Sequence, residues 1–423
     1  MRSIGAICAV ALLALAGCGG SSSSKSGGSG ASTVQGGPLT AADVKLAADY
    51  IGGTPGKATK SPITVGLITI NGGPITDAIG PTFPKSAARL INERLGGIDG
   101  HPLQFKECAI GASDQVAQQC GQQFRNDPNM VAVLDPSMPA GGQALLGTLN
   151  GAKPTFCAIP FQPELFGTDV FCANGGVFSG STFVSFLKQK TTSRHIAQIL
   201  PDSEIFRQLA AVNVKQYKAA GMDVVGSGFV PLDSPEVTSA VVASGVQKAD
   251  AIAVTVTSNT QCIAVAKALK ALNISPKVPI ISLPTCTESA VAKALGDIPH
   301  WIYFDVGESP LVSKSAEMAV FRDAMHTYNK GRIAIWANMK FGSTMLMAKI
   351  LNQVGADNLT PAAVTAGAKA YKGHMFLGDE IDFGRLPWRN AGTMRARFYR
   401  YDGDGKWTDA TDGQWVDLPP AID

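Results

Sequence analysis

The sequence predicts an α/β protein with two doubly wound parallel-sheet lobes. From residue 63 onward, short runs rich in Val, Ile and Phe alternate with longer amphipathic runs, which is the pattern of repeated strand–helix–strand units. The alternation occurs in two successive series, the first over residues 63–159 and the second over residues 183–306. The chain has 423 residues, of which 45% are hydrophobic, and this is enough to form two cores.

The first series opens with a strand at residues 63–70 (ITVGLITI), which is apolar along most of its length, as buried parallel strands are. A helix is expected at residues 85–97, where apolar side chains recur on one face and Gly96-Gly97 ends the pattern. The rest of the series is expected as strands at residues 102–109, 130–135 and 154–159 and helices at residues 114–124 and 141–150.

The second series repeats this organisation. Strands are expected at residues 195–200, 222–230, 250–256, 278–283 and 301–306, and helices at residues 183–190, 206–221, 236–249, 261–273 and 289–295. The C-terminal part differs, because three helices follow one another at residues 315–328, 333–354 and 361–371. Two stretches with strand character then follow at residues 379–390 and 393–408, and an Asp-Gly-Asp-Gly turn interrupts the second.

The N-terminal region predicts export and attachment to a membrane. Arg2 precedes an apolar run at residues 4–16, which has the length of a secretory signal and is too short to span a bilayer. The sequence Leu-Ala-Gly-Cys at residues 15–18 resembles the bacterial lipobox, which implies that cleavage leaves Cys18 as an acylated N-terminus. An ordinary secretory signal with a chance cysteine is the alternative. The expected location is extracytoplasmic, with a lipid anchor in the bacterial cell membrane.

A tether is expected between this anchor and the first lobe. The run at residues 19–37 is rich in Gly and Ser and lacks the apolar side chains needed for a core. A short helix is expected after Thr40, with Asp43 completing a capping box and Gly52-Gly53 ending the helix. The predicted organisation is therefore a signal peptide at residues 1–18 and a flexible tether with a short helix at residues 19–61.

Six cysteines remain beyond Cys18, and an even number in an exported chain favours disulfides. Fifteen connectivities are open. Pairing of nearest neighbours closes three short loops, each worth about 3 kcal/mol in the chain-entropy model. The expected pairs are Cys108–Cys120, Cys157–Cys172 and Cys262–Cys286. Because there is no close Cys pair and the histidines are scattered, no metal site is expected.

Charge and motifs argue against several classes of function. The formal net charge is +3 and the charges are dispersed, so nucleic acid is not an expected partner. The motifs GxSxG, HExxH and CxxC do not occur. The chain is therefore not expected to be an enzyme, and neither catalytic residues nor a cofactor are expected.

The start of the first series resembles the type I periplasmic binding proteins, in particular the leucine/isoleucine/valine-binding group of ABC-transporter receptors. The resemblance rests on the strand and Gly-Pro loop at residues 63–74 and on a helix that ends in the turn GGIDGHP at residues 96–102. The stretches 130–146 and 151–166 match the next strands and loops of that family. The likeness extends from residue 63 to the C-terminus.

The resemblance implies two lobes, and the chain passes from one to the other more than once. It also implies that the ligand binds in the cleft between them and that the lobes close around it by hinge bending. Lobe 1 is expected at residues 62–180 and 307–376, and lobe 2 at residues 181–306 and 377–423. The partners that it implies are a small-molecule ligand and the permease subunits of an ABC importer, and a monomer is expected.

The resemblance also implies a set of ligand-binding positions. Ser137 matches the family serine that holds a ligand carboxylate, and the glycine-containing loop after the first strand can approach a ligand closely. The family's hydroxyl-bearing position after the fourth strand falls on Phe161, and its acidic position falls near Pro284 and Thr285. The candidate ligand-binding residues are Asn71, Gly72, Gly73, Ser137, Ala158, Ile159, Phe161, Ile205, Thr257 and Thr285.

These departures affect the expected ligand. A buried ammonium needs a carboxylate or a full set of acceptors, and neither Pro284 nor Thr285 supplies a carboxylate. Glu204, Glu288 and Glu308 are alternatives from other loops. The expected function is a membrane-anchored solute receptor of an ABC importer for an amino-acid-like metabolite or a small carboxylate or amide. The alternatives are a ligand-sensing lipoprotein for a signalling receptor and a secreted hydrolase.

Overall fold

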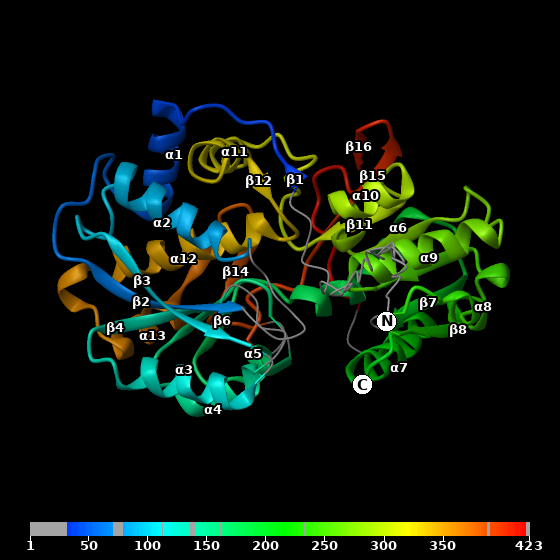
Figure 1. Cartoon of the computed structure of the whole chain (residues 1–423), viewed down its shortest axis with the longest axis horizontal. Coiled ribbons are helices and arrows are strands. Elements are labelled where there is room, and N and C mark those ends of the chain that lie inside the picture. Colours follow the sequence, from blue (N-terminus) through cyan, green and yellow to red (C-terminus); the bar gives the residue numbers. More distant parts are fainter. Residues whose placement is uncertain are drawn as a thin grey trace, which may run out of the picture.

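The computed structural model describes residues 32–70, 79–111, 113–135, 141–160, 162–231, 234–386 and 390–419. These residues form two α/β lobes side by side, each around its own sheet (Figure 1). The predicted fold class, with two doubly wound lobes, is confirmed.

Lobe 1 contains a five-stranded parallel sheet in the order β3-β2-β4-β5-β6. Its strands are β2 (Ile63–Ile70), β3 (Leu103–Ile110), β4 (Met130–Asp135), β5 (Thr155–Cys157) and β6 (Val170–Cys172). Its first helices are α2 (Thr82–Arg94), α3 (Asp114–Asn126), α4 (Gly142–Leu149) and α5 (Gln162–Phe166).

Both faces of this sheet are covered, because successive side chains of a strand point to opposite faces. Ala132 and Leu134 of β4 pack in the same core cluster as α2, whereas Val133 packs in a second cluster with α3 and α4. All six residues of β4 are buried. This explains why the strand is a continuous apolar run rather than an alternating one.

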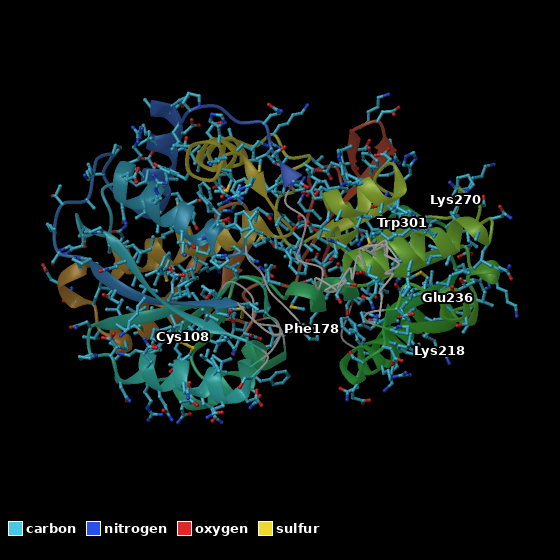
Figure 2. All side chains as sticks on the ribbon, viewed as in Figure 1. Cys108, Phe178, Lys218, Glu236, Lys270 and Trp301 are labelled. Carbon is cyan, nitrogen blue, oxygen red and sulfur yellow. A yellow bond between two sulfur atoms is a disulfide. The ribbon has the colours of Figure 1, made fainter. Side chains whose placement is uncertain are left out.

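Lobe 2 contains a seven-stranded sheet in the order β16-β15-β11-β10-β9-β7-β8. Its parallel strands are β7 (His195–Pro201), β8 (Asp223–Val230), β9 (Ala251–Val254), β10 (Ile280–Ser282) and β11 (Ile302–Asp305). The antiparallel strands β15 (Arg397–Gly403) and β16 (Lys406–Asp409) extend it at one edge. Charged residues such as Lys218, Glu236 and Lys270 lie on the outer side of this lobe (Figure 2).

The helices of lobe 2 are α6 (Thr182–Lys190), α7 (Glu204–Ala219), α8 (Thr238–Ala243), α9 (Asn259–Ala271) and α10 (Ser289–Leu295). The expected helix at residues 236–249 is shorter than predicted. It is divided into α8 and the 3₁₀ turn η2 (Val246–Lys248), because Gly245 has a φ of 74°.

The chain crosses between the lobes three times, at residues 173–181, 306–315 and 393–396. The first crossing contains the 3₁₀ turn η1 (Gly176–Ser181), where Phe178 lies between the lobes (Figure 2). After the second crossing the chain adds three further helices to lobe 1. These are α11 (Ala316–Asn329), α12 (Ala337–Val354) and α13 (Pro361–Ala370).

Two small two-stranded pairings complete lobe 1. One joins β13 (Lys372–His374) to β14 (Glu380–Asp382), and the expected lobe boundary at residue 376 falls inside this hairpin. The other joins β1 (Ser32–Thr33) to β12 (Arg332–Ile333), although about three hundred residues of chain separate them.

The segment before β2 packs on lobe 1 and does not behave as a tether throughout. Helix α1 (Ala41–Ile51) has the expected capping box between Thr40 and Asp43 and ends at Gly52. Its residues Ala47, Ala48 and Ile51 are fully buried against α11 and α12. Burial of this apolar face holds residues 40–58, which include the expected short helix, against the lobe.

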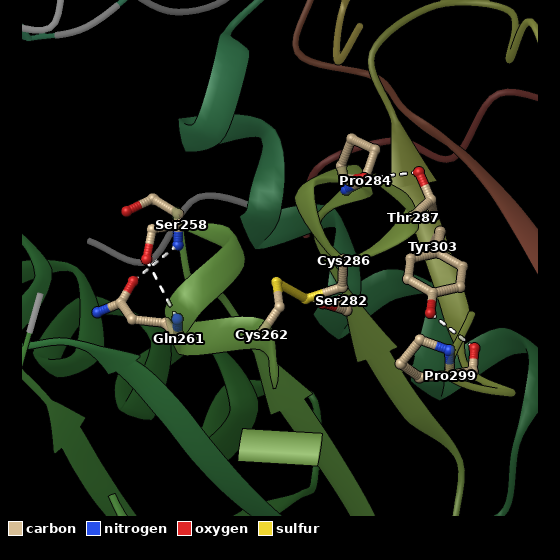
Figure 3. The surroundings of a disulfide bond; sticks show 10 residues. Ser258, Gln261, Cys262, Ser282, Pro284, Cys286, Thr287, Pro299 and Tyr303 are labelled. Atoms are coloured by element: carbon tan, nitrogen blue, oxygen red, sulfur yellow. Dashed lines mark hydrogen bonds between the residues drawn. A yellow bond between two sulfur atoms is a disulfide. The ribbon is translucent and has the colours of Figure 1, made fainter. Parts of the chain in front are cut away.

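The structure joins the six cysteines in the nearest-neighbour scheme. One disulfide links β3 to α3, one links β5 to β6, and one links α9 to the 3₁₀ turn η3 (Pro284–Thr287), as Figure 3 shows for the last. The pairs are Cys108–Cys120, Cys157–Cys172 and Cys262–Cys286.

Within the part of the chain that the structure describes, no helix combines the length and the hydropathy needed to cross a bilayer. In the same residues no three His, Cys, Asp or Glu side chains gather as a metal site would require.

Candidate solute-binding site

The carboxyl ends of the parallel strands carry the sequence-predicted site residues. In lobe 1 the strand order changes direction between β2 and β4, and in lobe 2 between β7 and β9. Loops at such switch points are where open α/β sheets bind ligands. Several predicted positions lie outside the described residues: Asn71, Gly72, Gly73, Ser137 and Phe161, as well as the lipidation candidate Cys18.

Ala158 and Ile159 follow β5 and are fully buried. The amide of Ala158 donates to the carbonyl oxygen of Asp135 at 2.9 Å, and the Ala158 carbonyl accepts from Nδ2 of Asn174 at 2.8 Å. Ile159 packs in the main core cluster. In this structure both residues therefore stabilise the loop rather than present side chains to an open cleft.

Ile205 and Thr257 flank the switch point of lobe 2. Ile205 lies in the first turn of α7. Thr257 is exposed, and its amide donates to Oε1 of Gln261 at 3.2 Å. Ser258 caps α9 by accepting from the Gln261 amide at 3.2 Å (Figure 3). Thr257 therefore belongs to the capping structure of α9, which places it at the end of β9 with its side chain accessible.

Thr285 lies in η3 and is only 7% exposed. It does not line the cavity described next, although its neighbours Pro284, Thr287 and Glu288 do. The loop predicted to bind the ligand therefore lines the cavity, but it does so with Pro284, Thr287 and Glu288 rather than with Thr285.

A cavity of about 40 Å³ lies where the two lobes meet beside the second crossing. The loop after β10 and the end of β11 form its lobe 2 side, and the segment from β12 to the start of α12 forms its lobe 1 side. The described lining residues are Ser32, Pro284, Thr287, Glu288, Asp305, Ser309, Pro310, Leu311, Ile333, Ala334, Ile335, Trp336 and Asn338.

Glu288 is one of two buried carboxylates in this cavity, with 4% of its surface exposed. Its Oε1 accepts a hydrogen bond from the amide of Ile335 at 2.7 Å, which joins lobe 2 to lobe 1. Of the three acidic alternatives named from the sequence, Glu288 is the one in the cavity wall. Glu204 accepts from Gln208 on α7, and Glu308 accepts from Ser313 and Ser315.

Asp305 is the second carboxylate and ends strand β11. It is 5% exposed, and burial raises the pKa of its carboxyl to about 7 despite a hydrogen bond from the Gly307 amide at 3.2 Å. At neutral pH the protonated and ionised forms of this carboxyl are therefore both populated.

Trp336 and Asn338 supply polar groups from lobe 1. Trp336 has a φ of 57° at the N-terminal end of α12, and its indole Nε1 is buried with no acceptor among the described residues. Oδ1 of Asn338 is likewise buried without a donor there, whereas its Nδ2 donates to the Glu308 carbonyl at 2.8 Å. Trp336 and Asn338 thus add one donor and one acceptor without partners among the described residues to the residues that line the cavity.

Sequence analysis did not single out Asp305, Trp336 or Asn338. Asp305 is the last residue of β11 and lies one residue before the end of the strand predicted at residues 301–306, and this position was a usable signal, since such strand ends meet at the cleft. Trp336 and Asn338 fell inside the helix expected from residue 333, and their apolar surroundings show no sign of a turn. The helix begins only at Ala337, because Trp336 is in the left-handed region.

The structure thus combines two α/β lobes with a cavity to which both lobes contribute. The chain belongs to the periplasmic binding protein family, whose model matches residues 62–406. Its fold is that of the type I members. This family consists of extracytoplasmic binding components of transporters rather than enzymes. No curated protein sequence shows detectable similarity to the chain.

Solved structures with the same fold include receptors for different solutes. A solute-binding protein from R. palustris in complex with 4-hydroxybenzoate is 15% identical with a TM-score of 0.68, covering 85% of this chain and 98% of that one. A leucine-binding protein from Thermotoga maritima is 10% identical with a TM-score of 0.67 and coverages of 84% and 99%. A fatty-acid ABC-transporter substrate-binding protein from Thermomonospora curvata is 15% identical with a TM-score of 0.65 and coverages of 87% and 98%.

Proposed function

We propose that the chain is a lipid-anchored receptor of an ABC importer, which captures a small metabolite between its lobes and delivers it to a permease. The family and the interlobe cavity support the capture of a solute. The lipobox-like sequence at residues 15–18 supports an anchor at Cys18, on the outer face of the bacterial cell membrane. The receptor acts as a monomer and needs no cofactor.

The ligand that fits best carries an amino group. The cavity wall contains the carboxylates Glu288 and Asp305, and none of its described lining residues is Lys, Arg or His. This is the observation that carries the proposal, because a buried ammonium requires a carboxylate as its partner. Glu288 thus supplies the acidic group that the sequence did not place at Pro284 or Thr285.

Apolar side chains complete the same wall. Pro284, Leu311 and Ile333 line the cavity beside the polar groups. An amino acid with an aliphatic side chain presents both kinds of surface, with its ammonium toward Glu288 and its hydrocarbon toward these residues. We therefore expect leucine and its close analogues to bind better than 4-hydroxybenzoate.

Capture requires the lobes to move. A volume of about 40 Å³ accommodates a few water molecules and is too small for a whole amino acid. The three crossings can act as a hinge, and opening would break the Glu288–Ile335 hydrogen bond between the lobes. A ligand ammonium at Glu288 replaces that contact, so binding and lobe position are linked.

A thermal unfolding series tests this ligand class. The mature protein is unfolded and refolded to remove retained solute and is then heated with leucine, N-acetyl-leucine, 4-methylpentanoate or 4-hydroxybenzoate. Leucine at about a hundred times its Kd should raise Tm by about 3–5 °C, whereas the three compounds without a free amine should not. An equal shift with 4-methylpentanoate or 4-hydroxybenzoate would rule out recognition of an amine.

A further inference from the structure

A segment near the N-terminus reaches the interlobe cavity. Residues 32–36, which we call the N-terminal strap, run antiparallel to β12, with Ser32 opposite Ile333 and Thr33 opposite Arg332. The amide of Val34 donates to the carbonyl of Gly331 at 2.9 Å. Figure 1 shows β1 beside β12 on the side of lobe 1 that faces lobe 2. Because β1 lies within the predicted tether (residues 19–61) and Ser32 lines the cavity, part of that tether reaches the cavity.

Side chains of the strap alternate between two environments, as in any strand. Thr33 and Gln35 are exposed, whereas Ser32 and Val34 are half-buried. Val34 packs against the main core cluster, and Ser32 lines the cavity together with Glu288 and Trp336. The strap therefore has a packed anchor at Val34 and presents Ser32 as part of the cavity wall.

Gly36 fixes the path of the strap. A Cβ atom at this position would lie 2.5 Å from the carbonyl oxygen of Arg322 on α11, which is closer than nonbonded atoms approach. The backbone of the strap consequently lies directly against α11. The next residue is different, since a Cβ at Gly37 would meet only Oδ1 of Asp323 at 3.8 Å.

The strand that the strap pairs with carries two groups of the cavity. β12 continues into Ile335, whose amide binds Glu288 across the lobes, and into Trp336, whose backbone is in the left-handed region. A two-residue strand has little stability of its own, and pairing with β1 restricts its position. Displacement of the strap should therefore release both Ile335 and Trp336.

We propose that the N-terminal strap is part of the ligand site: it contributes the Ser32 hydroxyl to the cavity wall and, through β12, positions Ile335 and Trp336. This proposal rests on the proposed function, in which the cavity receives the solute. The hydroxyl can donate to or accept from a polar group of the ligand. Residues 32–36 then link the tether to the cavity that captures the solute.

A matched pair of variants of the full-length mature protein tests the positioning role without any ligand. Gly36→Ala forces the strap away from α11, whereas Gly37→Ala adds the same methyl group one residue further on without a clash. Hydrogen–deuterium exchange of the peptide covering residues 331–338 should be at least tenfold faster in Gly36→Ala and unchanged in Gly37→Ala. Equal exchange rates in the two variants would overturn the positioning role.

Titration with leucine as the probe tests the role in binding. Gly36→Ala and Ser32→Ala should each weaken leucine binding by about three- to tenfold, the loss of one hydrogen bond or of its geometry, with Gly37→Ala equal to wild type. Unchanged affinity in both variants would overturn the proposal. If the wild-type protein binds no amine-bearing solute, the proposed ligand class fails, and the exchange measurement still decides whether the strap positions β12.

Discussion

Oε1 of Glu288 in lobe 2 accepts a hydrogen bond from the backbone amide of Ile335 in lobe 1 at 2.7 Å, and Glu288 also lines the interlobe cavity. The carboxylate therefore takes part in the contact between the lobes and in the proposed recognition of an ammonium group. The Ile335 amide and a ligand ammonium would therefore compete for the Glu288 carboxylate. This competition would link ligand binding to the position of the lobes.

Replacement of Glu288 separates the two roles. Glu288→Gln retains an oxygen that can accept from Ile335 and removes the charge, so we expect leucine affinity to fall at least tenfold while the free energy of unfolding changes by less than about 1 kcal/mol. Glu288→Ala removes both and should destabilise the protein by about 1–3 kcal/mol. Calorimetric titration and urea unfolding measure the two effects. Glu236→Gln, on the outer side of lobe 2 (Figure 2), is the matched control, and equal affinity losses in the control would contradict the assignment.

Asp305 should make the free energy of unfolding depend on pH. Burial raises the pKa of its carboxyl from 3.8 to about 7, so the folded state holds a proton that the unfolded state has released between these two values. The stabilisation is complete below pH 3.8 and is lost as the pH rises toward 7, by up to about 4 kcal/mol. Urea unfolding at pH 5 and pH 8 should differ by about 2–3 kcal/mol from this cause in wild type and by less in Asp305→Asn. The same difference in both proteins would show that Asp305 is not responsible.

His374 should act in the same direction at higher pH. Its Nε2 lies 3.0 Å from Oε1 of Glu317, and this hydrogen bond raises the pKa of the imidazole above 6.5. Its stabilising contribution is present below pH 6.5 and is lost as the pH rises through the raised value. Because the imidazole is partly exposed, the effect should be modest. Imidazole NMR titration measures the pKa directly, and a pKa in Glu317→Gln equal to that of wild type would exclude this cause.

Because all six cysteines are paired in disulfides, none of them should have a free thiol. An alkylating reagent without reductant should modify none of them in the denatured mature protein. Replacing Cys262 by serine should make Cys286 reactive and cost about 3 kcal/mol of stability. Mass spectrometry counts the modified residues, and labelling of two or more cysteines in wild type would refute the three-pair scheme.

Lipidation at Cys18 predicts the cellular fraction. The wild-type chain should incorporate labelled palmitate and sediment with membranes, and Cys18→Ser should do neither, since the acyl chains supply the membrane affinity. Cys8→Ser changes a cysteine of the same predicted signal and should leave both properties intact. Membrane sedimentation of labelled Cys18→Ser would place the anchor elsewhere.

Periodicity predicted most of the fold, because the buried strands and amphipathic helices are local patterns. The strands at residues 63–70 and 130–135 lie where they were expected. Strand β6 was not predicted, since three residues are too few to show a period. The expected helix at residues 236–249 is interrupted at Gly245, whose backbone is left-handed.

The site was less predictable, for a different physical reason. The family resemblance directed attention to Pro284 and Thr285 in the loop after β10, and Glu288 was named only as an alternative from another loop. The pairing of Ser32 with Ile333 joins distant parts of the chain through two-residue strands, which leave no periodic signal. The left-handed backbone of Trp336 likewise depends on tertiary packing rather than on its neighbours in sequence.

A crystal structure of the mature protein after saturation with leucine tests the central claim most directly. The account predicts a single amino acid between the lobes with its ammonium nitrogen within hydrogen-bonding distance of the Glu288 carboxylate. A closed structure with no solute between the lobes, or a bound solute whose amine lies away from Glu288, would contradict it.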